Sequence, residues 1–134
     1  MALTSLQKIN DYAGNTELLG DKHPNVADVL EELQGYVTKT VRKAVASNYS
    51  ATVEDVYIGV TSTAADRTVT LPAAAACGNG KVFIIKDESG AANTDNITVD
   101  ANAAETIDGA ATKVISTAYG STRLICNGSN WFTC

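Results

Sequence analysis

The hydrophobic positions of this chain follow two different periodicities. Between residues 26 and 46, apolar residues recur every three or four positions, which is the spacing of one face of an α-helix. From about residue 53 onward, short runs alternate apolar and polar residues at every second position. Turns rich in Gly, Asn and Asp separate these runs, as is typical of short β-strands. The pattern therefore predicts a mostly β protein with an α-helix near its N-terminus.

The predicted β-unit spans residues 52–134, and we expect a compact antiparallel β-sandwich or a barrel-like module. Val69 and Leu71 fall on one face of their strand, which predicts that both point inward. Residues 82–85 are apolar on both faces, which predicts a central strand or one between the sheet and another subunit. Alternation in the last hairpin predicts two opposite faces: Leu124, Cys126 and Trp131 on one, Ile125 and Phe132 on the other.

The helix predicted over residues 26–46 is amphipathic, with a narrow apolar stripe. Asn25 can cap its start, and Lys39, Arg42 and Lys43 would complement the helix dipole in its last turns. A helix this short is marginal alone, so its stripe must pack on the β-unit or on copies of itself. The single-file stripe favours a short coiled coil of about three heptads. The predicted oligomer interface comprises Val26, Leu30, Leu33, Val37 and Val41.

Residues 1–25 are polar, with a few isolated apolar residues. Leu3, Leu6 and Ile9 recur at three-residue spacing, which allows one or two helical turns. The rest of the segment is rich in Asn, Asp and Gly. Such a segment is typical of an extended docking arm and equally of a frayed terminus. If it is an arm, these three apolar residues are the expected docking contacts.

Composition and charge exclude several partners. The 134-residue chain carries a net charge of −5, and its basic residues are not interleaved with aromatic ones, so we expect no nucleic-acid binding. No apolar run approaches the roughly 18 residues that cross a membrane, and no signal-peptide layout occurs. We therefore expect a protein made in the cytosol that contacts no membrane. A β-unit this small and alanine-rich is expected to need oligomerisation for stability.

The sequence contains no recognisable catalytic motif. The single histidine, His23, has no evident acid or nucleophile partner, and residues 78–81 lack the spacing of a phosphate loop. Acidic residues in the turns form no D-x-D-x-D loop, and the three cysteines form no CxxC motif. We expect no enzyme, cofactor or metal site.

The last hairpin also bears on the cysteines. Its predicted register places Cys126 opposite or near Trp131, and Cys134 opposite a residue near Arg123 on the other face. That geometry makes a Cys126–Cys134 disulfide unfavourable, so we expect free thiols.

Aromatic side chains offer one possible ligand contact. Tyr119 and Trp131 can stack on a sugar ring, although such residues more often pack at a strand edge or a subunit interface. We retain both as possible glycan contacts.

Six β segments and turns follow one another in a recognisable order: residues 68–74, 80–90, 96–99, 105–109, 119–121 and 127–132. This order resembles a small β-module of tailed-phage fibre, tailspike and other virion appendage proteins. The resemblance covers about half of the chain, and the order is more specific than any one piece.

This resemblance implies a virion location and a trimeric, non-catalytic unit. The chain has no long shaft, collagen-like repeat or enzymatic domain, so we expect a capsid decoration or head-fibre protein. Residues 1–25 would dock on the major capsid protein or another virion protein, residues 26–46 of three copies would bundle, and the β-unit would project. The alternative is a tail-fibre or baseplate protein that binds host surface glycan.

Overall fold

The structure is a computed structural model that describes residues 40–134. The predicted docking residues and all of the predicted helix stripe except Val41 therefore lie outside the described residues. The described part contains nine strands and one helical turn. These elements are β1 (Arg42–Val45), β2 (Tyr49–Ser50), β3 (Tyr57–Val60), β4 (Arg67–Thr70), α3 (Ala74–Cys77), β5 (Asn79–Asp87), β6 (Ile97–Asp100), β7 (Thr112–Ile115), β8 (Ser121–Asn127) and β9 (Trp131–Thr133).

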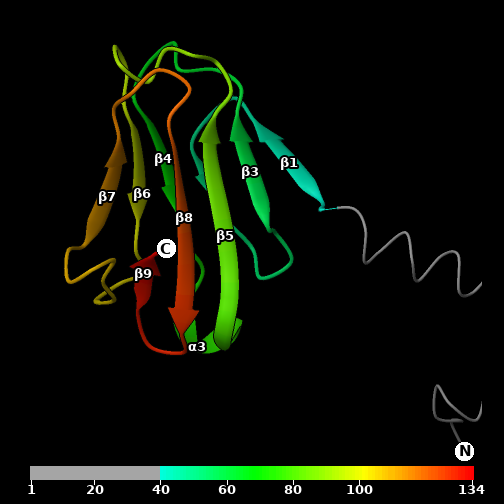
Figure 1. Cartoon of the computed structure of the whole chain (residues 1–134), viewed down its shortest axis with the longest axis vertical. Coiled ribbons are helices and arrows are strands. Elements are labelled where there is room, and N and C mark those ends of the chain that lie inside the picture. The colour runs from blue at the N-terminus through cyan, green and yellow to red at the C-terminus, as the bar shows by residue number, and fades with distance from the viewer. Residues whose placement is uncertain (1–39) are drawn as a thin grey trace, which may run out of the picture. The chain divides into compact units, whose positions relative to one another are not determined.

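The strands form two sheets that enclose one hydrophobic core (Figure 1). Sheet A has the order β1-β3-β5-β8-β9, and sheet B has the order β2-β4-β6-β7. Through β6 the chain alternates between the sheets, so each strand pairs in parallel with the strand two places earlier. The last three strands pair antiparallel with their neighbours. Residues 40–134 are therefore mostly β, with two mixed sheets and no closed barrel among them.

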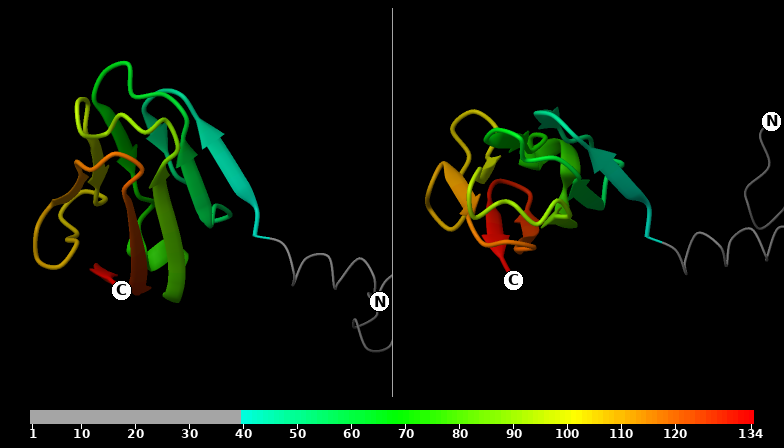
Figure 2. Two further views of the ribbon diagram at one scale, coloured as in Figure 1. Left: turned by 45° about the horizontal axis from the view of Figure 1, so that its top comes forward. Right: turned by 90° about the horizontal axis from the view of Figure 1, so that it is seen from above.

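The predicted antiparallel arrangement is wrong for the pairs formed among the first six strands, which are all parallel. Short strands separated by turn residues suggested hairpins, in which the chain returns along the same sheet. Here each turn passes the chain to the opposite sheet instead. A parallel pair needs a long crossover, and the strand of the other sheet supplies it. Figure 2 shows the resulting path, in which the chain winds around the core.

The predicted helix does not continue to residue 46, because Arg42–Val45 forms β1. Its four residues pair in parallel with β3, from Arg42 opposite Tyr57 to Val45 opposite Val60. Val45 is buried by this pairing, which overrides a weak helical period. The helix-dipole role predicted for Arg42 and Lys43 is therefore wrong, and Val41 is an exposed residue before a strand.

The alternation of apolar residues correctly predicts the core. Val69 and Leu71 are buried, and β5, which contains residues 82–85, is the central strand of sheet A. In the last hairpin Cys126 lies opposite Trp131, as predicted, and the Cys134 N–H donates to the carbonyl of Arg123. The predicted faces are also confirmed, because Leu124, Cys126 and Trp131 are buried whereas Ile125 and Phe132 are exposed.

Candidate functional surface

The end of β5 carries a fully buried carboxylate that organises two loops. Oδ1 of Asp87 accepts hydrogen bonds from the backbone N–H groups of Ser89 and Gly90, at 2.9 and 3.0 Å, and from the Ser89 hydroxyl at 2.6 Å. Oδ2 accepts from the N–H groups of Ala92 and Tyr119, at 3.1 and 3.0 Å. Burial acts to raise the pKa of Asp87, but these bonds outweigh it and hold the pKa below its ordinary value. Asp87 is thus a structural group.

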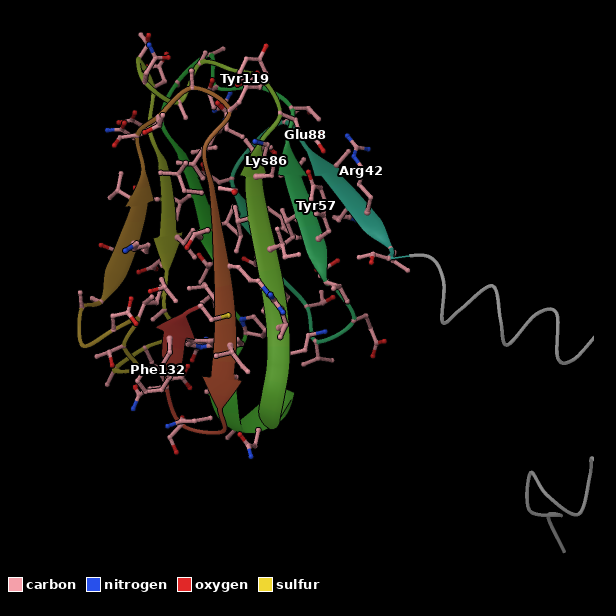
Figure 3. All side chains as sticks on the ribbon, in the orientation of Figure 1. Arg42, Tyr57, Lys86, Glu88, Tyr119 and Phe132 are labelled. Carbon is pink, nitrogen blue, oxygen red and sulfur yellow. The ribbon has the colours of Figure 1, made fainter. Side chains whose placement is uncertain are left out.

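The next residue, Glu88, lies across the outer face of sheet A (Figure 3). Its carboxylate pairs with the guanidinium of Arg42 on β1 and accepts the Tyr57 hydroxyl at 3.1 Å. The pairing with Arg42 lowers the pKa of Glu88, while burial and the Glu88 bond raise the pKa of Tyr57. Gly59 makes this position accessible, because a Cβ there would lie 2.4 Å from the carboxyl carbon of Glu88.

Tyr119 is presented at the same end of sheet A, in the loop before β8. Its backbone has a φ of 57°, which is unusual for a bulky residue. Asp87 holds its N–H, and the amino group of Lys86 donates to its carbonyl oxygen. The ring lies against Gly90, where a Cβ would come within 2.4 Å of it. Tyr119 is nevertheless 63% exposed, so its ring is held in place and accessible, and its glycan contact stays a prediction.

Trp131 is not available to a ligand, so its predicted role as a glycan contact is wrong. The side chain is fully buried and packs against Phe83, with 5.4 Å between the ring centroids. Its indole N–H donates to Glu105. Strand parity explains the error, because Trp131 shares the inward face with its cross-strand neighbour Cys126.

The outer faces of the two sheets differ in chemistry. On sheet B, Thr68, Thr98 and Val114 form one register row, and the next row consists of hydroxyl residues and one aspartate. On sheet A two register rows are mostly apolar, whereas the next row has Gly59, Lys86 and Ser121. The sheet A outer-face patch consists of one row with Val82, Ile125 and Phe132 and a second row with Tyr57, Ile84 and Arg123, which begins at Arg42 on β1.

The described residues include several acidic side chains and three thiols that could carry chemistry. Within residues 40–134 no group of three or more His, Cys, Asp or Glu side chains could hold a metal ion. All three cysteines are free; Cys126 is buried, and burial raises the pKa of Cys77. Asp55 bonds to Tyr49 and Thr52, and Asp108 bonds to Thr133. Over the same stretch, no helix is long and apolar enough to cross a membrane.

Some of these groups were visible in the sequence and others were not. The segment 87–90 is typical of a turn, and Asp87 does accept local N–H groups there. The cluster of Arg42, Tyr57 and Glu88 joins residues far apart in the chain, and its formation depends on the parallel register of β1, β3 and β5. No local signal in the sequence indicates that register.

Comparisons with protein-family models and with curated proteins find no match to this chain. The proposals below therefore depend on the sequence pattern and on the geometry of the described unit.

Proposed function

We propose that the protein is a structural phage virion protein, a homotrimeric capsid decoration or head-fibre protein without enzymatic activity. The observation that carries the proposal is the order of β segments between residues 68 and 132, which resembles the β-module of virion appendage proteins. That resemblance assigns no catalytic residue. The localisation that follows is the virion, assembled in the host cytoplasm.

The architecture of the β-unit supports a structural role. Its buried acid Asp87 binds backbone N–H groups and so stabilises the loops at one end of the sandwich. Asp55 and Asp108 act similarly, at Thr52 and Thr133. Carboxylates that bind backbone N–H groups in this way stabilise the conformation of surface loops. They are not free for proton transfer to a substrate.

In this proposal the N-terminal residues supply attachment and assembly. Residues 1–25 dock on the major capsid protein or another virion protein through Leu3, Leu6 and Ile9. The stripe at Val26, Leu30, Leu33 and Val37 joins three copies. Because β1 begins at Arg42, such a bundle must end before that residue.

Deletion of residues 1–20 tests the docking assignment. The truncated protein should lose binding to purified phage particles, measured by co-sedimentation, yet keep the mass of the intact oligomer in light scattering. Leu33→Asp is the complementary variant, since it should dissociate the oligomer while leaving the docking residues unchanged. Undiminished particle binding by the truncated protein would contradict the docking role of residues 1–20.

One observation favours the second candidate, a tail-fibre or baseplate protein that binds host surface glycan. Tyr119 is held by Asp87 and Lys86 with its ring largely exposed, which suits stacking on a sugar. Saturable binding to host polysaccharide that is lost in Tyr119→Ala, but kept in Val114→Ala on sheet B, would support this function. No binding by the intact protein would exclude it.

A further inference from the structure

The two sheets of this sandwich present opposite chemistry to their surroundings. The outer face of sheet B is lined mainly by Ser50, Thr68, Thr70, Thr98 and Thr112, as expected for a sheet face in water. At the equivalent positions the sheet A outer-face patch has valine, isoleucine and aromatic residues, with Arg42 and Arg123 in the row of Tyr57 and Ile84. Ile125 and Phe132 are 37% and 42% exposed. A contiguous exposed apolar patch of this kind is a feature of interaction surfaces.

We propose that the outer face of sheet A is the surface on which copies of this chain associate. The inference rests on the proposed homotrimer and names the part of the β-unit through which the three copies contact one another. The row of Val82, Ile125 and Phe132 would lie at the centre of the contact, with Tyr57 and Arg123 beside it. Aromatic residues and arginine are enriched in such contacts.

The size and shape of the face fit a protein partner. The five strands of sheet A have 4, 4, 9, 7 and 3 residues, which at about 3.3 Å per residue and about 4.8 Å between strands gives roughly 430 Å² in projection. A standard interface buries about 800 Å² of accessible surface per partner, and accessible surface exceeds projected area. A pleated sheet face is also broad rather than concave, whereas small ligands bind in clefts.

Chain continuity indicates that the partner is another copy. Sheet A contains β1, which replaces the end of the helix predicted over residues 26–46, and Thr40 and Val41 are the two described residues that precede it. Two residues span at most about 7 Å. Copies joined through residues 26–39 would therefore hold their β-units at high local concentration, and the apolar rows of sheet A would then be available for contact. Association there would also bury apolar area that a small alanine-rich core lacks.

Charge substitutions on the full-length chain test this surface. Ile125→Glu and Phe132→Glu should each raise the dissociation constant of the oligomer at least tenfold, measured by light scattering and native mass spectrometry over a concentration series. Val114→Glu is the matched control, because Val114 is a 48% exposed strand residue on the outer face of sheet B. Ile125→Thr, which keeps a β-branched side chain, provides a milder second variant. Circular dichroism confirms that each variant is folded.

The outcomes separate this surface from the proposed function. Dissociation by the sheet A variants but not by Val114→Glu supports the inference. If Leu33→Asp dissociates the oligomer and both sheet A charge variants keep wild-type affinity, the copies do not associate through sheet A, and the proposed homotrimer is unaffected. If the wild-type chain is monomeric at every concentration, both the sheet A contact and the proposed homotrimer are overturned. If Ile125→Glu leaves the oligomer unchanged but loses particle binding, the inference is overturned, and the partner of this surface is another virion protein.

Discussion

The indole nitrogen of Trp131 lies 3.3 Å from Oε2 of Glu105, and this contact joins the last strand to the loop between β6 and β7. The other carboxylate oxygen, Oε1, accepts the backbone N–H of Ala74 at 2.8 Å, at the first residue of α3. One side chain thereby satisfies a buried indole and a helix-end N–H that has no partner within its helix. Trp131 is consequently part of the framework of the sandwich.

Replacing Trp131 by phenylalanine should destabilise the protein measurably. The variant loses a hydrogen bond to a charged acceptor, worth about 1.5–3 kcal/mol, and leaves a small cavity beside Phe83. Urea unfolding followed by circular dichroism should show a lower midpoint at unchanged protein concentration. Val114→Ala, on the outer face of sheet B, should change the free energy of unfolding by less than about 0.5 kcal/mol. A midpoint for Trp131→Phe equal to that of wild type would contradict the role assigned to Glu105.

Asp87→Asn should weaken the fold and flatten its dependence on pH. Because the pKa of Asp87 is lower in the folded chain, its contribution is fully present above the unfolded pKa of about 3.9. The contribution disappears as the pH falls further, through the folded pKa. At pH 7 the amide should cost about 1–3 kcal/mol, since it presents a donor to N–H groups that need an acceptor.

Unfolding free energies measured between pH 3 and pH 7 check this expectation. The wild-type protein should lose more stability on acidification than Asp87→Asn does. Asp95→Asn, a substitution in the loop between β5 and β6, is the control and should keep the wild-type profile. Identical slopes for wild type and Asp87→Asn would show that this carboxylate does not stabilise the fold through its charge.

Gly90→Ala should be more costly than Gly80→Ala, although both glycines have a left-handed φ, of 79° and 90°. A Cβ at Gly90 would meet the ring of Tyr119 at 2.4 Å, whereas nothing lies within 4 Å of one at Gly80. Both variants bear the conformational cost of about 1 kcal/mol, and only Gly90→Ala must also displace the ring. The melting temperature of Gly90→Ala should therefore be lower than that of Gly80→Ala. Equal melting temperatures would mean that the Tyr119 ring moves away without cost.

Local pattern was enough to predict burial but not the order of the strands. The period of two placed Val69 and Leu71 inward, and it paired Cys126 with Trp131, because side-chain direction depends on immediate neighbours. Parallel pairing of β1 with β3 depends on a crossover through the other sheet, which no short segment encodes.

The errors in the helix end and in Trp131 have physical causes of the same kind. Val41 continues the three- and four-residue spacing of the predicted stripe, but it lies just before β1, whose pairing with β3 depends on distant residues. Trp131 is an aromatic residue that could stack on a sugar, but its parity with Leu124 and Cys126 places it on the core face. The Glu88 cluster needed the strand register, and the contrast between the outer faces needed the sheet order.

Immunogold labelling tests the central claim most directly. Antibody raised against the purified protein would be applied to phage particles from cells that express this chain, and examined by electron microscopy. The proposal predicts gold distributed over the capsid, absent from particles that lack the protein. Gold confined to the tail would contradict the capsid location and favour host attachment, with Tyr119 as the next target. Particles without gold would contradict a virion role altogether.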